Sequence, residues 1–308
     1  ADAIKFQTFK TENLVTPKAT KAFYQKQTTG TDESQFNMLR RFELNAKSHS
    51  DLLLYANELG IEFISSPFDM DSLDLLLKLN IPKIKIPSGE ITNIPLLKKI
   101  GASKKEIILS TGMSEMDEIE KAFEIIHSSG TPKSQITVLH CNTEYPSPMT
   151  DINLFAMLSI QAALDVSVGY SDHSMGIEIP IAAVALGASI IEKHFTLDKS
   201  FDGPDQQASL DPLEFQQMVK AIRNVEIALG DGIKRITSSE EKNLNVVRKF
   251  IVAKKSIEKG EIFSVYNLTT KRTGKGGCSA SLWDDIIGDI ATKKYKKEEP
   301  ILCPRRIE

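Results

Sequence analysis

The sequence predicts an α/β fold, a closed (β/α)₈ barrel of parallel strands, followed by a small β-rich module. Short apolar runs rich in Ile and Val, each ending on polar residues, alternate with longer amphipathic segments from residue 3 to residue 229. Such alternation is typical of a parallel sheet covered by helices. The pattern changes after Arg235, and a chain of 308 residues has room for one barrel of about 250 residues and an appendage.

Seven runs have the length and composition of buried strands. They span 3–8, 61–66, 83–88, 106–111, 136–142, 166–172 and 188–194. We expect helices between them over 48–59, 71–79, 115–127, 153–163 and 176–186, and a long helix over 212–229. A TIM barrel needs eight strands, so one β/α unit is missing, and we expect it upstream of Ala1. The alternative, an open doubly wound sheet, is disfavoured because no glycine-rich phosphate loop follows any strand.

The barrel domain is predicted to span residues 1–235, and a polar linker over 236–242 leads into a second domain over 243–308. After residue 246 the apolar runs are short and β-like, with a glycine-rich TGKGG segment and a small helix near 282–287. A change of pattern on either side of a polar stretch is typical of a domain boundary.

The composition limits the kinds of binding partner and the cellular compartment that the sequence predicts. The chain has 38 Lys and Arg residues and 41 Asp and Glu residues. It lacks the block of like charges that would indicate binding to nucleic acid or anionic lipid. The longest apolar run, 179–191, is shorter than the roughly 20 residues of a membrane span and is interrupted by a proline and a glycine. Cys141, Cys278 and Cys303 are odd in number and widely spaced, so we expect neither a disulfide framework nor a zinc knuckle. These features fit a cytoplasmic protein that acts on small molecules.

Polar residues end every predicted strand, where a parallel barrel carries its reactive groups. They are Lys5 and Gln7; Ser65 and Ser66; Lys85, Ser88 and Glu90; Ser110 and Thr111; His140 and Asn142; Ser171, Asp172 and His173; and Glu192 and His194. In a barrel without a functional site we would not expect so many polar and charged groups at one rim, because burial of an unpaired ion costs free energy. The rim therefore indicates an active site.

His173 and His194 form a candidate metal site. Side chains alternate along a strand, so Ser171 shares a face with His173, and Glu192 shares a face with His194. A single histidine is more often a hydrogen-bonded core residue than a ligand, but a pair at neighbouring strand ends beside carboxylates favours metal binding. Two imidazoles without a thiolate suit an open site for a divalent ion, Mn²⁺ rather than Mg²⁺.

Five residues on four strands have the chemistry to hold a phosphate and a carboxylate: Lys5, Ser66, Lys85, Ser88 and Ser110. Each serine alone could equally cap the following helix. A lysine is usually solvated, but both of these lie within apolar strands. His140 and Cys141 are consecutive, so only one of the two can face the site.

Nine blocks in the same order resemble the bacterial sialic acid synthases, a family that includes the legionaminic and pseudaminic acid synthases. The blocks are KFQT (5–8), SSPFD (65–69), KIPSGE (85–90), LSTGM (109–113), LHCNTEYPSP (139–148), SDHS (171–174), EKHFTLD (192–198), GPD (203–205) and TTKRTGKGG (269–277). The resemblance implies condensation of phosphoenolpyruvate with an N-acetylated amino sugar, on a (β/α)₈ barrel followed by a small antifreeze-like domain of the SAF type. The family's first strand, which ends in an acidic residue, is absent from this sequence.

The resemblance also implies roles for the motif residues. His173 and His194 would hold a divalent metal, preferably Mn²⁺, with Mg²⁺ or Co²⁺ as alternatives. Phosphoenolpyruvate would contact Lys5, Ser66, Lys85, Ser88, Ser110, Asn142 and Ser171. The amino sugar would contact Gln7, Tyr145 and Asp205. Glu90, Glu192 and Lys85 would be catalytic, and Arg272 would reach into the active site of a partner subunit in a domain-swapped homodimer.

The main expectation for the activity is N-acetylneuraminate synthase, which condenses phosphoenolpyruvate with N-acetylmannosamine and water to give sialic acid and phosphate. The nearest alternative is a legionaminic or pseudaminic acid synthase that takes a 2,4-diacetamido-6-deoxy hexose. A metal-dependent barrel hydrolase would use histidines similarly, but usually with three or more protein ligands. A non-catalytic carbohydrate-binding protein would bind saccharides without turnover.

Overall fold

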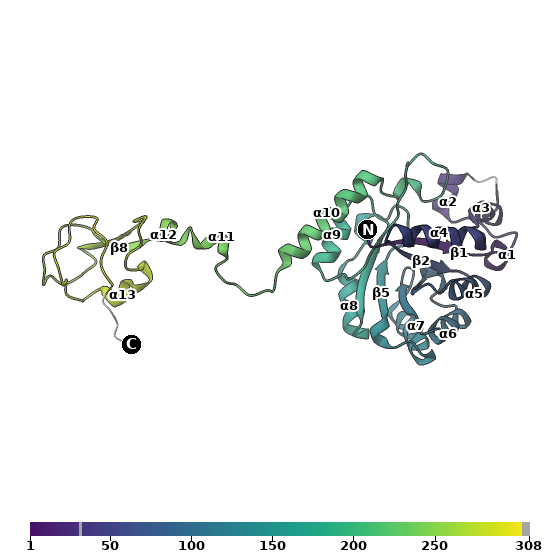
Figure 1. Ribbon diagram of the computed structural model, residues 1–308, viewed down its shortest axis with the longest axis horizontal. Coiled ribbons are helices and arrows are strands. Elements are labelled where there is room, and N and C mark those ends of the chain that lie inside the picture. Colours follow the sequence, from purple (N-terminus) through teal and green to yellow (C-terminus); the bar gives the residue numbers. More distant parts are fainter. Residues whose placement is uncertain (31–32, 304–308) are drawn as a thin grey trace. The chain divides into compact units, whose positions relative to one another are not determined.

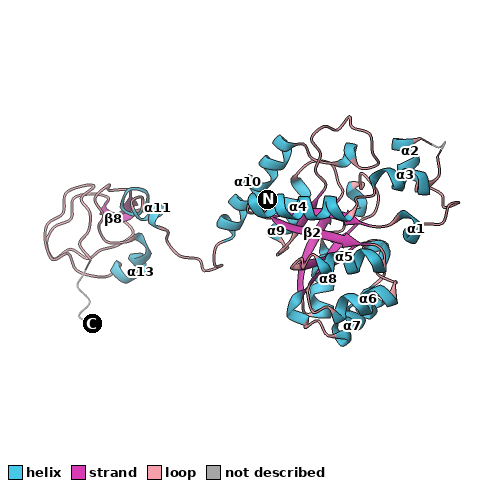
Figure 2. Ribbon diagram, turned by 45° about the vertical axis from the view of Figure 1, so that its right-hand side comes forward, coloured by secondary structure: helices cyan, strands magenta, loops and turns pink. Residues whose placement is uncertain are grey.

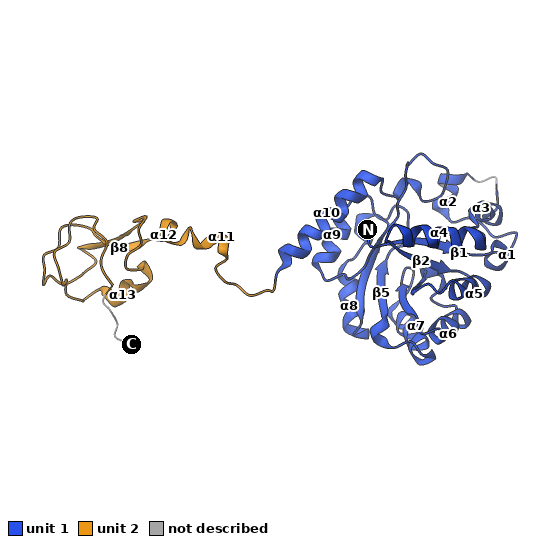
Figure 3. Cartoon of the chain, viewed as in Figure 1, with its two compact units in different colours: residues 1–230 blue, residues 231–308 orange. Residues whose placement is uncertain are grey.

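The computed structural model describes residues 1–30 and 33–303 of the chain. The chain forms two compact units, unit 1 (Ala1–Gly230) and unit 2 (Asp231–Glu308), which Figure 3 colours separately. Gly230 ends the last helix of unit 1 with a φ of 60°, a left-handed conformation that glycine adopts without steric strain. The predicted linker 236–242 lies within unit 2 and contains the short helix α11 (Ser238–Glu241).

Seven parallel strands form the sheet of unit 1, in the same order in space as in the sequence. Figure 1 shows this unit with β1, β2 and β5 labelled. They are β1 (Ala3–Thr8), β2 (Glu62–Pro67), β3 (Lys83–Ile86), β4 (Glu106–Ser110), β5 (Ile136–Cys141), β6 (Ser167–Asp172) and β7 (Ile191–Lys193). The predicted α/β class with a parallel sheet is confirmed. A doubly wound sheet would reverse its strand order at a switch point, which this sheet does not do.

Helices connect the strands and surround the sheet (Figure 2). They are α1 (Thr11–Leu14), α2 (Phe23–Thr29), α3 (Gln35–Phe42), α4 (Ala46–Glu58), α5 (Met70–Lys78), α6 (Ile94–Ala102), α7 (Met116–Ser129), α8 (Phe155–Leu164), α9 (Glu178–Ala185) and α10 (Pro212–Leu229). The main core lies between helices and sheet, where strand residues such as Phe63, Ile84 and Val138 are buried. None of the helices in the described ranges combines the length and the hydropathy needed to cross a bilayer.

The other face of the strands encloses a smaller group of side chains, here called the inner apolar layer. It consists of Ile64, Ile108 and Leu139, with Ala3 and Ile190 packed against them. Ala3 begins β1 and Ile190 directly precedes β7, so the first and the last strand both reach this layer. The sheet is therefore curled into a half-barrel. An eighth strand upstream of β1 stays a prediction.

Unit 2 is built around a short antiparallel pair, β8 (Phe250–Ala253) and β9 (Leu268–Lys271). Its remaining helices are α12 (Leu244–Val247) and α13 (Trp283–Ile286), the latter within the small helix predicted near 282–287. Ile251, Leu268 and Tyr295 belong to a separate buried core, so unit 2 has its own hydrophobic centre. Its antifreeze-like character stays a prediction.

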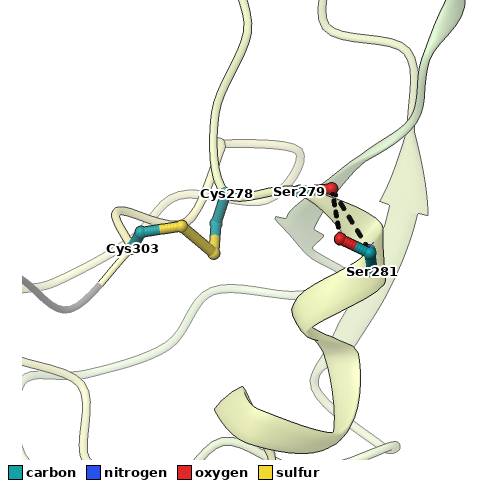
Figure 4. The surroundings of a disulfide bond; sticks show 4 residues. All are labelled: Cys278, Ser279, Ser281 and Cys303. Carbon is teal, nitrogen blue, oxygen red and sulfur yellow. Dashed lines mark hydrogen bonds between the residues drawn. A yellow bond between two sulfur atoms is a disulfide. The ribbon is translucent and has the colours of Figure 1, made fainter. Parts of the chain in front are cut away.

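Cys278 and Cys303 form a disulfide in unit 2, as Figure 4 shows, so the expectation that the cysteines form no disulfide framework was wrong for these two residues. The backbone N–H of Cys278 donates to the carbonyl oxygen of Ile301 at 3.2 Å, which places Cys303 beside Cys278 although the two are 25 positions apart in the sequence. The pairing depends on this return of the chain, which cysteine spacing alone does not reveal. Cys141 is buried in unit 1 as a free thiol.

Candidate active site

The inner face of the half-barrel gathers polar side chains just beyond the inner apolar layer. Ser66, Ser110 and Cys141 each follow a residue of that layer by two positions, so strand alternation puts them on the same face. Lys85 and Glu192 meet there from β3 and β7. Because these strands are parallel, their carboxyl ends form a single rim.

A cluster of opposite charges joins three strands at the centre of this rim. The carboxylate of Glu192 lies 3.2 Å from the Nζ of Lys5 on β1 and 3.1 Å from the Nζ of Lys85. Ser171 on β6 donates its hydroxyl to the same carboxylate at 3.0 Å. Burial alone would raise the pKa of Glu192, but the two lysines outweigh burial and hold that pKa well below its usual range. Two cations against one carboxylate leave a positive charge that suits an anionic ligand.

Burial and the neighbouring ammonium of Lys5 lower the pKa of Lys85, while Glu192 opposes this effect. Lys85 is almost fully buried, whereas Lys5 is partly exposed. The positive charge at the rim therefore depends on Glu192, which compensates the buried lysine in the absence of a ligand.

The structure brings His173 and His194 together, with ring centroids 5.2 Å apart. The Nδ1 of His173 faces the carbonyl oxygen of Asn142, which can only accept, so Nδ1 carries the proton. Nε2 keeps its lone pair and lies 3.5 Å from the hydroxyl of Ser171. Burial lowers the pKa of His173 to about 4 and that of His194 to about 3, so both rings are neutral at pH 7. A neutral imidazole whose other nitrogen donates to a carbonyl is the usual form of a metal ligand.

The donor set fits an open divalent site. Oδ2 of Asp205 lies 3.6 Å from Nδ1 of His194, and Oδ1 of Asp205 is buried without a hydrogen-bond partner in the described structure. Burial raises the pKa of Asp205 to about 6. Within residues 1–30 and 33–303, no group of three or more His, Cys, Asp or Glu is arranged to hold a metal. A divalent metal held by the two imidazoles would keep positions open for water and substrate, unlike a metal in a closed structural site.

Tyr145 lies beside both histidines, and Tyr24 packs against Tyr145; these two tyrosines are here called the aromatic wall. The ring of Tyr145 lies 4.1 Å from that of His173 and 5.4 Å from that of His194, measured between centroids. Tyr24, on α2, packs against Tyr145 at 4.8 Å, and burial raises the pKa of Tyr24 to about 12. Sequence reasoning missed Tyr24 because it lies in the long connection between β1 and β2, away from any strand end.

Ser66 and Ser110 carry buried hydroxyls with no hydrogen-bond partner among the described residues. Buried polar atoms are normally paired, so these two hydroxyls indicate space for a polar ligand. Ser88 differs, because its hydroxyl oxygen accepts the N–H of Gly112 at 2.9 Å and lies 3.3 Å from the Sγ of Cys141.

Asn142 has a local role in the structure. Its Oδ1 accepts the N–H of Glu144 at 2.7 Å and the hydroxyl of Ser147 at 3.1 Å, so it holds the turn that carries Tyr145. Its carbonyl oxygen also accepts from His173, as described above. Asn142 thereby supports both the aromatic wall and the metal-binding face.

Within the described part of the chain, three other predicted residues form no hydrogen bond or ion pair with the charged cluster. Glu90 accepts a hydrogen bond from the side chain of Asn93 at 2.6 Å, and burial raises the pKa of Glu90. Gln7 is exposed on β1, opposite Ser66 in the strand register. Arg272 is exposed in unit 2, directly after β9.

The end of β5 decides between His140 and Cys141. Cys141 faces inward, where it touches Ser88, while the Nε2 of His140 lies 2.8 Å from the carbonyl oxygen of Ile152. The ring of His140 packs 5.6 Å from that of Tyr170. His140 is therefore a structural residue behind the strand, and the inward residue at this position is the cysteine.

Known proteins share this architecture over most of the chain. The NeuB family pattern matches residues 1–234. The chain is 53% identical to the N,N'-diacetyllegionaminic acid synthase of Campylobacter jejuni, over 98% of this chain and 90% of that protein. Identity to the enzyme of the same name from Legionella pneumophila is 41%, over 94% of this chain and 81% of that protein.

More distant relatives extend the comparison. Human N-acetylneuraminate-9-phosphate synthase is 34% identical, over 88% of this chain and 75% of that protein. Among solved structures, the sialic acid synthetase of Leptospira borgpetersenii superposes with a TM-score of 0.68 at 33% identity, over 79% of this chain and 80% of that one. The fold, the site and these relatives define a nonulosonic acid synthase, as the sequence motifs indicated. The chain belongs to the NeuB family.

Proposed function

We propose that the protein is an N,N'-diacetyllegionaminic acid synthase, which condenses phosphoenolpyruvate with a 2,4-diacetamido-6-deoxy hexose and water. The two relatives with that name are 53% and 41% identical to this chain. The human N-acetylneuraminate-9-phosphate synthase and a Campylobacter jejuni pseudaminic acid synthase are each 34% identical. The alternative expectation is thus better supported than the main one, which was N-acetylmannosamine as the acceptor.

The observation that carries the proposal is the Lys5–Glu192–Lys85 cluster beside two unpaired buried hydroxyls. Phosphoenolpyruvate carries a phosphate and a carboxylate, which lysine ammonium groups and hydroxyl donors recognise. Ser66 and Ser110 have no other partner in the described chain, so a bound anion would satisfy them.

His173 and His194 would hold a divalent metal, Mn²⁺ by preference. When bound, the metal would supply Lewis acidity toward the aldehyde oxygen of the open-chain sugar. The chain contributes the rest: Asn142 fixes the tautomer of His173, and burial keeps both rings neutral. Asp205, Tyr145 and Gln7 would orient the sugar.

The reaction balances without a redox partner. Carbon 3 of phosphoenolpyruvate forms a bond to the aldehyde carbon, water adds to carbon 2, and the bond between carbon 2 and the phosphate oxygen breaks. The products are a nonulosonic acid and inorganic phosphate. Lys5 and Lys85 would stabilise the charge on the departing phosphate. Glu192, held ionised by these lysines, keeps their ammonium groups in place, and Glu90 would be a second active-site carboxylate.

The deciding experiment measures phosphate release from phosphoenolpyruvate with Mn²⁺ and one of three additions: the 2,4-diacetamido-6-deoxy sugar, N-acetylmannosamine, or no sugar. We expect release with the first sugar, at a kcat/KM at least about 10-fold above that with the second, a difference of about 1.4 kcal/mol. Preference for N-acetylmannosamine would make the protein an N-acetylneuraminate synthase. Release without sugar would indicate a hydrolase, and binding of sugar without release would indicate a carbohydrate-binding protein.

We further propose that Arg272, in an antifreeze-like unit 2, completes the active site of a partner subunit in a domain-swapped homodimer. Its exposure and its place after β9 support a role in contact with another surface. The variant R272A should raise the KM for the sugar and leave the KM for phosphoenolpyruvate unchanged. Light scattering should give the mass of a dimer, and a monomer with full activity would refute the proposal. The expected cytoplasmic location stays a prediction.

A further inference from the structure

Asp172 and Lys193 form an ion pair with 2.5 Å between Nζ and Oδ2, and both side chains are 0% exposed. The two residues are opposite each other in the register of β6 and β7. Lys193 also donates to the carbonyl oxygen of Ser174, and Asp172 accepts the N–H of Ser174 at 2.9 Å. One buried pair thus ties together the end of β6, the turn that follows it, and β7.

Each member of the pair directly precedes a histidine of the candidate metal site. Successive side chains point to opposite faces of a strand, so the ion pair lies behind the strand ends while His173 and His194 meet on the inner face. β7 is only three residues long and pairs only with β6 among the strands of the described sheet, while the N–H of Leu210 donates to the carbonyl oxygen of His194 just beyond it. The separation of the two imidazoles therefore depends in part on how firmly the ends of β6 and β7 are joined.

A buried ion pair is a poor source of stability, because desolvation of both ions offsets their attraction. Apolar residues of similar volume often stabilise a protein as well or better. A fully buried pair at this one register position therefore fits a role in geometry better than a role in stability.

We infer that Asp172 and Lys193 are positioning residues for the metal site, a conclusion that rests on the metal role proposed for His173 and His194. The pair sets the spacing of the two imidazoles from the outer face of the strands, without contact with metal or substrate. Removal of the pair should weaken metal binding even when the stability of the fold is preserved.

The test compares D172N, K193M and the double variant D172N/K193M by thermal unfolding and by titration with Mn²⁺ followed by electron paramagnetic resonance. Each single variant leaves one buried charge unpaired, so its Tm should fall. The double variant removes both charges and should recover most of the Tm. We expect the Kd of the double variant for Mn²⁺ to remain about 10-fold or more above wild type, the range seen for residues that support metal ligands.

The control is E62Q/K83M, which removes a partly exposed ion pair between β2 and β3 at the opposite ends of the strands, together with the contact of Lys83 to Glu106. It should leave the Kd for Mn²⁺ unchanged. A double variant D172N/K193M that binds Mn²⁺ as tightly as wild type would overturn the inference, because the pair would then serve stability alone. If the double variant does not fold, the isosteric D172N, measured below its Tm, decides by the same criterion.

Wild type and H173A separate this inference from the proposed function. Tight Mn²⁺ binding by wild type that is lost in H173A supports the metal role and makes the double variant informative. If wild type and H173A bind Mn²⁺ alike, the metal role fails and the inference fails with it. If H173A loses Mn²⁺ binding but D172N/K193M binds Mn²⁺ as tightly as wild type, the proposed function stands and the positioning role is refuted.

Discussion

Lys5 on β1 and Glu192 on β7 form an ion pair with 3.2 Å between Nζ and the carboxylate, although the two strands do not pair with each other in the described sheet. The same carboxylate binds Lys85 on β3. Side chains therefore link the first and last strands of the half-barrel at the level of the candidate active site. This link makes the charge balance of the site part of the stability of unit 1.

Glu192→Gln should lower the free energy of unfolding of unit 1 by about 3 kcal/mol, because it leaves the buried ammonium of Lys85 uncompensated. Urea denaturation followed by far-UV circular dichroism measures the change. Glu226→Gln removes an exposed ion pair with Arg223 and should cost less than about 0.5 kcal/mol. Equal effects of the two substitutions would contradict a buried charge cluster at this site.

Removal of metal should abolish condensation, and the two histidines at the strand ends should differ from His140. Dialysis against EDTA should stop phosphate release, and Mn²⁺ should restore it in wild type. His194→Ala should raise the Kd for Mn²⁺ about 100-fold or more, since it removes a proposed direct ligand, and loss of a residue that only supports a ligand already costs about 10- to 100-fold. His140→Ala should lower stability, because it leaves the Ile152 carbonyl without its partner, but keep the wild-type Kd. A raised Kd for Mn²⁺ in His140→Ala would contradict the structural role assigned to His140.

Tyr24→Ala should raise the KM for the sugar about 10-fold and leave the KM for phosphoenolpyruvate unchanged. The substitution removes the ring that supports Tyr145, and an aromatic pair is worth about 1 kcal/mol beyond its buried area. Tyr24→Phe keeps the ring and serves as the control, with a KM near wild type. Steady-state kinetics with each substrate varied in turn would test the split, and parallel increases in both KM values would refute it.

Glu90→Gln should stabilise the protein at pH 7 but not at low pH. Burial raises the pKa of Glu90 above its unfolded value, so the ionised side chain costs stability as the pH rises through the folded pKa. Below the unfolded pKa of about 4.3 the carboxyl is neutral in both states, and the cost disappears. The Tm difference between variant and wild type should thus be positive at pH 7 and near zero at pH 3.5. Glu124→Gln, at an exposed position on α7, should show no such dependence.

Reduction of the Cys278–Cys303 disulfide should destabilise unit 2 by about 3.5 kcal/mol, the loop-closure estimate for a bridge across 25 residues. Calorimetry of the full chain with and without dithiothreitol measures this change. The variant C278S/C303S should unfold like the reduced protein and should no longer respond to dithiothreitol. A response that persists in this variant would point to Cys141 instead.

The sequence by itself determined the α/β class, the seven strands, and the shared faces of Ser171 with His173 and of Glu192 with His194. These features follow from the period of two along a strand and from the alternation of strands with helices, which are local properties of the chain. The family motifs added the enzyme class, because they keep their order over nearly the whole chain.

Only the tertiary structure decided which of His140 and Cys141 faces the site, that Tyr24 reaches Tyr145, and that Cys278 meets Cys303. Each of these outcomes depends on contacts between segments far apart in the sequence, or on which face of the sheet turns inward when it curls. Local periodicity carries no information about such contacts, because it is the same whichever face is inside. The fold class was therefore readable from the sequence, while the wall of the site and the pairing of the cysteines required the three-dimensional arrangement.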